Sequence, residues 1–178
     1  MRKIILSMML SLDSYIEAPG NDIDWHVWDD EMEDYMLRFF ETVDTIVLGR
    51  KTYELMVGYW PSARGELAHF MNETPKIVFS RTLQELEWNS SLRTAIDPEE
   101  INQLKQQSGK NLVIFGGADL ATAFIENNLI DEYQLIINPV ALGNGTPLFK
   151  NLPQQCSFKL TKAKVFNCGN VLLHYQPA

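Results

Sequence analysis

The chain has 178 residues, which is the size of one ordinary domain, and its 46% hydrophobic residues predict a packed core and exclude global disorder. Its net charge of −8 argues against a nucleic-acid binder, because phosphate contacts need clustered Lys and Arg. Nine acids and one base lie between Asp22 and Asp44, so this segment accounts for the whole net charge. It is expected to be either a solvated helix face or a segment that disfavours anionic substrates. We treat residues 1–178 as a single domain.

The N-terminus looks like the start of a signal peptide, because Arg2 and Lys3 precede the apolar run Ile4–Leu12. The run is short and ends at Asp13 instead of at a small-residue cleavage site. No segment approaches the roughly 18 apolar residues of a membrane-spanning helix. We therefore predict a buried first strand and a cytoplasmic protein.

Two cysteines, Cys156 and Cys168, are too few for a disulfide scaffold and favour reduced thiols. Their spacing also allows them to face each other across a hairpin. The three histidines have no metal-ligand spacing with each other or with the cysteines, so no metal site is predicted.

Short segments rich in Ile, Val, Leu and Phe recur along the chain and indicate strands. The first four lack polar alternation, which is typical of strands covered on both faces in a parallel sheet. The last two flank Asn167–Gly169, a plausible hairpin turn. The expected strands are Lys3–Leu10, Thr45–Leu48, Lys76–Ser80, Leu112–Phe115, Glu132–Asn138, Ser157–Phe166 and Asn170–Gln176.

Helical segments alternate with these strands, which indicates an α/β domain. The clearest runs from Asp29 to Thr42, with one apolar stripe and acids in its first turns, where the helix dipole favours them. Another begins at Asp97, which suits the N-cap, and Glu100 closes a capping box. Further helices are expected over Thr52–Val57, over Arg64–Asn72 and after Gly116-Gly117.

Three expected strands end in residues suited to an anionic ligand. Gly116-Gly117 joins a strand directly to a helix, which makes either an anion site or a tight structural turn. Arg50 and Lys51 lie at an expected helix start, where they oppose the helix dipole unless an anion is bound; the alternative is two solvated cations. Arg81 follows a third strand between two hydroxyl residues. Because ligands bind at the carboxyl ends of strands in open α/β sheets, a polyanionic ligand is predicted.

Asp13 follows the first strand and begins a long loop. A carboxylate at a strand end is a candidate substrate anchor or proton relay, and the alternative is a loop-capping aspartate. The segment Asn138–Phe149 has the turn residues of a folded-back loop and is interpreted as structural.

Five motifs together resemble the dihydrofolate-reductase-like superfamily, most closely the riboflavin-biosynthesis reductase branch (RibD C-terminal type). In chain order they are S-L-D-x-Y-I, L-G-R-K-T-Y, F-S-R-T, F-G-G-A-D-L and P-V-A-L-G-N-G-x-P-L-F. The resemblance covers Arg2 to Tyr175. It implies a three-layer α/β/α domain with a mainly parallel mixed sheet and an antiparallel C-terminal hairpin. It also implies NADPH as hydride donor, a small-molecule substrate and a homodimer.

By position, the resemblance assigns cofactor-binding roles to residues in each motif. Met9 and Ile16 flank the nicotinamide carboxamide, Ser80 and Arg81 match the 2′-phosphate and adenosine side, and Asp13 matches an acid near the substrate, the candidate catalytic residue. The phosphate-binding turns correspond to Gly49, Arg50, Lys51 and Thr52 and to Gly116, Gly117, Ala118, Asp119 and Leu120. Ser14 departs from the family, which usually has glycine there, and no pterin-anchoring acid is identified.

The resemblance implies an NADPH-dependent reductase of a small heterocyclic or carbonyl/imine compound. One alternative is 5-amino-6-(5-phosphoribosylamino)uracil reductase of riboflavin biosynthesis, although the chain lacks the deaminase domain that often accompanies it. The other alternative is a protein that binds NADPH without turnover.

Overall fold

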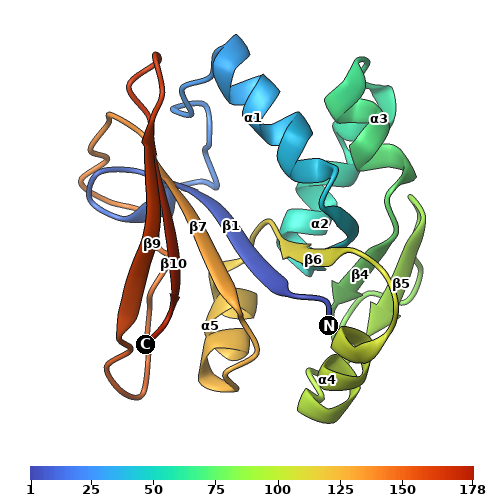
Figure 1. The fold of residues 1–178 in the computed structure, drawn as a ribbon. Helices are drawn as coiled ribbons and strands as arrows, with labels where there is room; N and C mark the ends of the chain where they lie inside the picture. The colour runs from blue at the N-terminus through green and yellow to red at the C-terminus, as the bar shows by residue number, and fades with distance from the viewer.

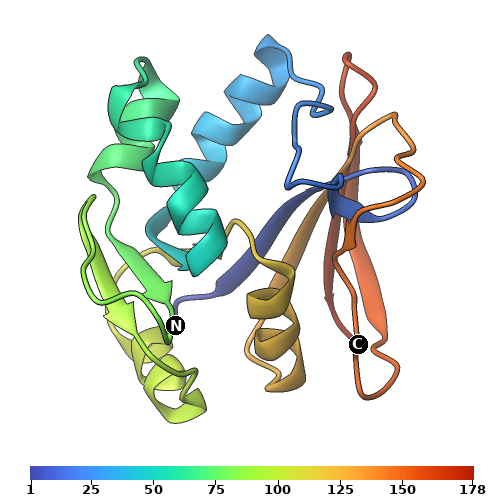
Figure 2. The ribbon, with the colours of Figure 1, turned by 180° about the vertical axis from the view of Figure 1, so that it is seen from behind.

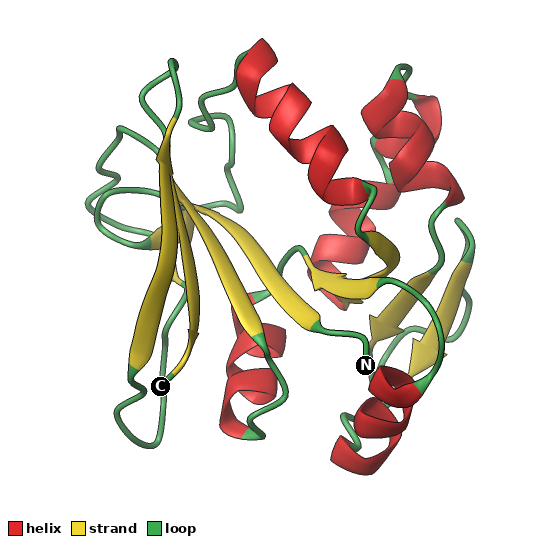
Figure 3. Ribbon diagram, in the orientation of Figure 1, coloured by secondary structure: helices red, strands yellow, loops and turns green.

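The computed structural model describes residues 1–178 and contains an eight-stranded mixed sheet with the order β5-β4-β3-β6-β1-β7-β10-β9 (Figures 1 and 3). The neighbouring strands from β5 to β7 pair in parallel, whereas β10 pairs antiparallel with β7 and β9. The strands are β1 (Ile4–Leu10), β3 (Val43–Gly49), β4 (Lys76–Phe79), β5 (Ser90–Arg93), β6 (Asn111–Ile114), β7 (Glu132–Ile137), β9 (Phe158–Val165) and β10 (Val171–Pro177).

Five α-helices and one short 3-10 helix connect these strands. They are α1 (Asp30–Phe40), α2 (Arg50–Val57), η1 (Trp60–Ser62), α3 (Glu66–Glu73), α4 (Pro98–Gln106) and α5 (Ala118–Glu126). Asp29 caps α1 by accepting the Met32 N–H at 2.9 Å, and Asp97 caps α4 by accepting the Glu99 N–H at 2.9 Å. The predicted capping box is not formed, because the Glu100 carboxylate pairs with Arg93 instead.

The helices cover both faces of the sheet, as the three views show (Figures 1, 2 and 3). Side chains of α1, α2 and α3 share one buried cluster with residues such as Ile46 and Val113. Side chains of α4 and α5 share a second cluster with residues such as Leu6 and Ile114. The expected three-layer α/β/α arrangement with an antiparallel C-terminal hairpin is confirmed.

All seven expected strands are present, with bounds that shift by at most two residues. Three further strands were not expected: β5, β2 (Tyr15–Glu17) and β8 (Thr146–Pro147), of which β2 and β8 form a separate two-stranded sheet. Each is four residues or fewer, and β5 reads Ser-Ser-Leu-Arg, so none has a detectable apolar period.

The N-terminal strand β1 lies between β6 and β7 and is almost wholly buried, in agreement with its interpretation as a strand. No helix is long and apolar enough to cross a membrane. Cys156 and Cys168 are both free.

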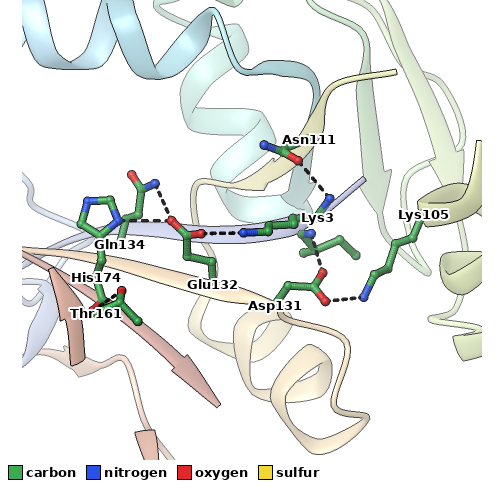
Figure 4. A network of polar contacts seen from close by, with 9 residues as sticks. Lys3, Lys105, Asn111, Asp131, Glu132, Gln134, Thr161 and His174 are labelled. Carbon is green, nitrogen blue, oxygen red and sulfur yellow. Dashed lines mark hydrogen bonds and ion pairs between the residues drawn. The ribbon is translucent and has the colours of Figure 1, made fainter. Parts of the chain in front are cut away.

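Polar contacts join β1 to its neighbours at the start of the strand (Figure 4). The Asp131 carboxylate accepts the Ile4 N–H at 2.8 Å and pairs with Lys105 of α4 at 2.7 Å. Glu132 pairs with Lys3 at 3.4 Å and contacts the His174 ring at 3.2 Å. These contacts lie at the opposite end of β1 from its carboxyl terminus, so they stabilise the sheet register and leave the other edge free for a ligand.

Candidate functional site

A cleft of about 1020 Å³ opens at the carboxyl ends of β3, β4 and β6. The neighbouring strands β3 and β6 continue into helices on opposite faces: α2 packs into one core cluster through Tyr53, and α5 into the other through Leu120. Such a point, where adjacent connections diverge, leaves a crevice in which open α/β sheets bind their ligands. The topology therefore places a ligand site between the start of α2 and the start of α5.

The two helix starts are in direct contact. A Cβ atom added to Gly117 would lie 3.9 Å from the Gly49 Cα, and one added to Gly116 would lie 2.9 Å from the Thr52 hydroxyl oxygen. Gly117 also has a φ of 88°, a conformation that favours glycine. Glycine is thus favoured at position 117 by the backbone angle and at position 116 by the close approach of Thr52.

Both helices begin without a capping side chain. Gly49 precedes α2 and Gly117 precedes α5, and neither N-terminus receives a side-chain hydrogen bond. The first N–H groups of each helix are therefore available to a ligand, and the helix dipoles favour an anion there. The start of α3 at Gly65 is also uncapped. Only the α2 and α5 starts, however, line the cleft described above.

The cleft carries four cations, namely Arg50, Lys51, Arg81 and Lys150. Two of them are paired within the cleft: Arg50 contacts Glu54 at 3.0 Å, and Lys150 contacts Asp119 at 2.7 Å. Glu17 is the remaining carboxylate of the lining. Together with the uncapped helix starts, these cations make an anion with several phosphate groups the best-matched ligand.

Eleven of the thirteen residues expected to bind a cofactor lie together in this cleft. They are Ile16, Gly49, Arg50, Lys51, Thr52, Ser80, Arg81, Gly117, Ala118, Asp119 and Leu120. Gly116 is adjacent and packs against Thr52. Met9 lies outside the lining, on β1, where it pairs with Ile136 and packs against the α1 side of the core.

The Ser80 hydroxyl is already engaged by the chain. It is buried and accepts the Thr82 N–H at 3.2 Å and the Leu83 N–H at 3.0 Å, which shapes the turn after β4. Arg81 is exposed at the next position. Ser80 therefore directs the turn that presents Arg81 to the cleft.

Asp13 is exposed and lies outside the cleft lining. Its carboxylate accepts the Ser11 hydroxyl at 2.6 Å and the backbone N–H groups of Leu142 and Gly143 at 3.0 and 2.6 Å. These hydrogen bonds, led by that from Ser11, lower the pKa of Asp13 from 3.8 to about 2. Because both carboxylate oxygens accept hydrogen bonds from within the chain, the geometry favours a role for Asp13 as an anchor of the loop formed by residues 138–152 (the 138–152 loop) over a role as a proton donor.

Several cleft residues were not expected from the sequence. Thr94, Ala95 and Ile96 follow β5, a strand too short and polar to be recognised. Thr146 lies in the segment Asn138–Phe149, which was interpreted as structural, and Lys150 follows that segment and was given no role. The β2–β8 pairing brings the 138–152 loop to the cleft. Its paired residues, Tyr15 with Pro147 and Glu17 with Thr146, are far apart in the sequence, so no local pattern of residues predicts the contact.

The sheet order, the diverging connections and the cleft lined by glycines and cations are those of a dihydrofolate-reductase-like protein of the α/β/α class. The chain belongs to the RibD C-terminal domain family, whose model matches residues 2–173. The expected family and fold are thereby confirmed.

Similar proteins span nearly the same length. The uncharacterized protein YyaP of Bacillus subtilis (strain 168) is 36% identical over 179 residues, covering 98% of this chain and 94% of that protein. A crystal structure of a Shewanella sp. PV-4 protein with a provisional riboflavin-biosynthesis name superposes with a TM-score of 0.82 at 26% identity, covering 100% of this chain and 99% of that one.

A more distant likeness is to the diaminohydroxyphosphoribosylaminopyrimidine deaminase/5-amino-6-(5-phosphoribosylamino)uracil reductase of Thermotoga maritima. The TM-score is 0.70 at 14% identity, over 99% of this chain and 57% of that one. At this identity the likeness supports the fold alone.

Proposed function

We propose that this protein is an NADPH-dependent reductase that transfers a hydride to a small heterocyclic or carbonyl/imine compound. The observation that carries the proposal is the meeting of two uncapped helix N-termini, at Gly49 and Gly117, in a cleft with four cations. A dinucleotide supplies the phosphate groups that this arrangement suits, and membership of the RibD C-terminal family makes a nicotinamide the fitting choice.

Each part of the cleft has a distinct task in this proposal. The N–H groups after Gly49 and Gly117 bind the pyrophosphate, with Arg50 and Lys51 supplying charge. Arg81 binds the 2′-phosphate that distinguishes NADPH from NADH. The bound cofactor supplies the hydride, and the backbone around Met9 and Ile16 orients the nicotinamide, as the family resemblance implies.

In this proposal, ordered water or another group next to the bound substrate donates the proton that is needed after hydride transfer. Asp13 was the candidate for this task, and that role stays a prediction. Its low pKa and its hydrogen bonds to the 138–152 loop support a positioning role instead. A group that remains ionised near neutral pH is poorly matched to proton donation there.

Titration of the pure protein with NADPH, followed by tryptophan fluorescence, tests the proposal. We expect saturable binding in the micromolar range, and Arg81→Ala should weaken NADPH binding about 10-fold while changing NADH binding little, because charge-assisted hydrogen bonds to the extra phosphate are lost. Lys162→Ala, a cation on the distant strand β9, is the matched control. If the protein does not bind NADPH at high micromolar concentrations, the proposal is wrong.

Turnover assays distinguish two more specific functions. Reduction of 5-amino-6-(5-phosphoribosylamino)uracil is favoured by the riboflavin-biosynthesis name of the Shewanella relative. Turnover of that compound, or rescue of a riboflavin auxotroph, would establish it. A protein that binds NADPH but oxidises it with no pterin, ribosylaminopyrimidine or carbonyl compound would instead be a binding protein on the same fold.

A further inference from the structure

Lys150 and Asp119 both line the cleft and form an ion pair, with 2.7 Å between the Lys150 Nζ and the Asp119 Oδ1. The two residues come from different parts of the fold: Asp119 is in the first turn of α5, and Lys150 lies just after β8. The Lys150 side chain is 29% exposed and the Asp119 side chain 85%. The Lys150 ammonium is therefore partly buried beside the uncapped start of α5, whereas its partner Asp119 is largely exposed to solvent.

The backbone around Lys150 is well anchored. The Lys150 carbonyl accepts the Thr122 hydroxyl at 3.3 Å, and the Leu148 N–H donates to the Ser14 carbonyl at 3.2 Å. Asp13 fixes the preceding part of the same loop through Leu142 and Gly143. The loop thus keeps its place without the ion pair, so the Lys150 ammonium is free to exchange partners while its backbone stays fixed.

Electrostatics favours such an exchange when a phosphate group enters. An ion pair with one well-solvated partner contributes about 0–1 kcal/mol, so little is lost when it opens. A phosphate at the start of α5 offers more negative charge than one carboxylate, together with the N–H groups and dipole of the helix. Lys150 also offers three donors on a flexible stem, which lets it turn from one anion to the other.

We propose that Lys150 is a phosphate ligand of the cofactor, held ready by Asp119 and released from it on binding. This inference rests on the proposed function and names a residue that neither the sequence motifs nor the family resemblance indicated. The target is the pyrophosphate beside α5, which NADPH and NADH share. Lys150 therefore contributes to affinity for both cofactors, in contrast to Arg81, which discriminates between them.

The experiment compares cofactor dissociation constants for Lys150→Met, Lys150→Arg, Asp119→Asn and the Lys150→Met/Asp119→Asn double variant. Lys150→Met should weaken NADPH and NADH by the same factor, about 10-fold, since one charge-assisted contact is lost. Lys150→Arg should retain binding. Asp119→Asn should bind both cofactors more tightly than the wild type, because the competing carboxylate is gone. Lys162→Ala on β9 again serves as the control.

If the Lys150–Asp119 ion pair only links α5 to the loop, Lys150→Met and Asp119→Asn should weaken cofactor binding alike, and the double variant should bind no more weakly than either single variant. That result would overturn the inference. Unchanged cofactor binding by Lys150→Met would overturn it too. Thermal melts of each variant separate loss of fold from loss of contact.

Inorganic pyrophosphate, titrated into the wild type and Lys150→Met, separates the inference from the proposed function. If the wild type binds neither NADPH nor NADH, the proposed function fails. In that case pyrophosphate binding that weakens in Lys150→Met still supports the inference, and equal or absent pyrophosphate binding in the two proteins overturns it.

Discussion

Ser14 has a φ of 68°, in the left-handed region where a side chain is strained. Its N–H donates to the Ser11 carbonyl at 3.0 Å and its carbonyl accepts the Leu148 N–H at 3.2 Å. The turn after β1 therefore requires this backbone angle whatever residue is present. This requirement agrees with the glycine that the family resemblance implies at this position.

Ser14→Gly should leave the protein as stable as the wild type or raise the free energy of unfolding by up to about 1 kcal/mol, because the relief of left-handed strain exceeds the added chain entropy. Ser14→Val should lower it by more than about 1 kcal/mol, since a β-branched residue tolerates this angle least. Urea unfolding measures both. Equal losses in the two variants would contradict this account of the turn.

His26 is a half-buried histidine whose Nε2 atom has no hydrogen-bond partner. Burial lowers its pKa from 6.5 to about 4, and the nearby Asp22 opposes this only in part. The folded protein therefore keeps His26 neutral at a pH where the unfolded chain binds a proton. Since protonation favours the unfolded state, stability should fall as the pH drops from about 6.5 to about 4.

His26→Gln should remove this part of the pH dependence. Between pH 7 and pH 4.5 the wild type should lose about 1–2 kcal/mol more of its unfolding free energy than the variant, a figure reduced from the full shift because the ring is partly exposed. Urea unfolding at a series of pH values gives both curves. Parallel curves would show that His26 is protonated without cost in the folded protein.

The β2–β8 pair is the element that brings the 138–152 loop to the cleft. Gly145, just before β8, has a φ of 152°, and a Cβ atom there would lie 2.2 Å from the Glu17 carbonyl oxygen. That oxygen belongs to the backbone of β2 and cannot rotate away. Thr146 follows directly, so the position of this cleft residue depends on the contact.

Gly145→Ala should separate β2 from β8 and lower the free energy of unfolding by more than about 2 kcal/mol, because backbone strain and overlap act together. Gly143→Ala is the matched control: its φ is 74°, but a Cβ atom there would meet nothing within 4 Å. We expect the control to lose only about 1 kcal/mol. Chemical denaturation compares the two, and similar losses would refute a role for the Glu17 contact.

The elements that the sequence predicted well are those with their own local reason to form. Asp97 caps α4 as expected, and Asp29, expected as the first residue of its helix, is the N-cap of α1; a cap needs only residues within the same turn. The apolar runs in β1, β3, β4 and β6 indicate strands that are buried on both faces. By contrast, β5 and β8 are recognised as strands only from their pairing with β4 and β2, because their short sequences show no alternation of apolar and polar residues.

At the scale of the whole molecule, the segment that carries the net charge of −8 lies outside the cleft. None of the acids between Asp22 and Asp44 lines the cleft. Several have structural partners: Asp29 caps α1, Glu31 pairs with Lys164 at 2.9 Å, and Asp44 pairs with Arg2. The acidic segment therefore adds no carboxylate to the cations of the cleft. The expected homodimer stays a prediction, which light scattering measures.

The α/β class, the central strands and the three strand ends that carry glycines and cations can be read from the sequence alone, because each depends on residues close together in the chain. The folded structure sets how these strand ends combine. It brought Gly49 and Gly117 into contact at the divergence of β3 and β6, set Asp13 against the 138–152 loop and placed Lys150 beside Asp119. These arrangements depend on strand order and on pairings between distant segments, which no local pattern of residues encodes.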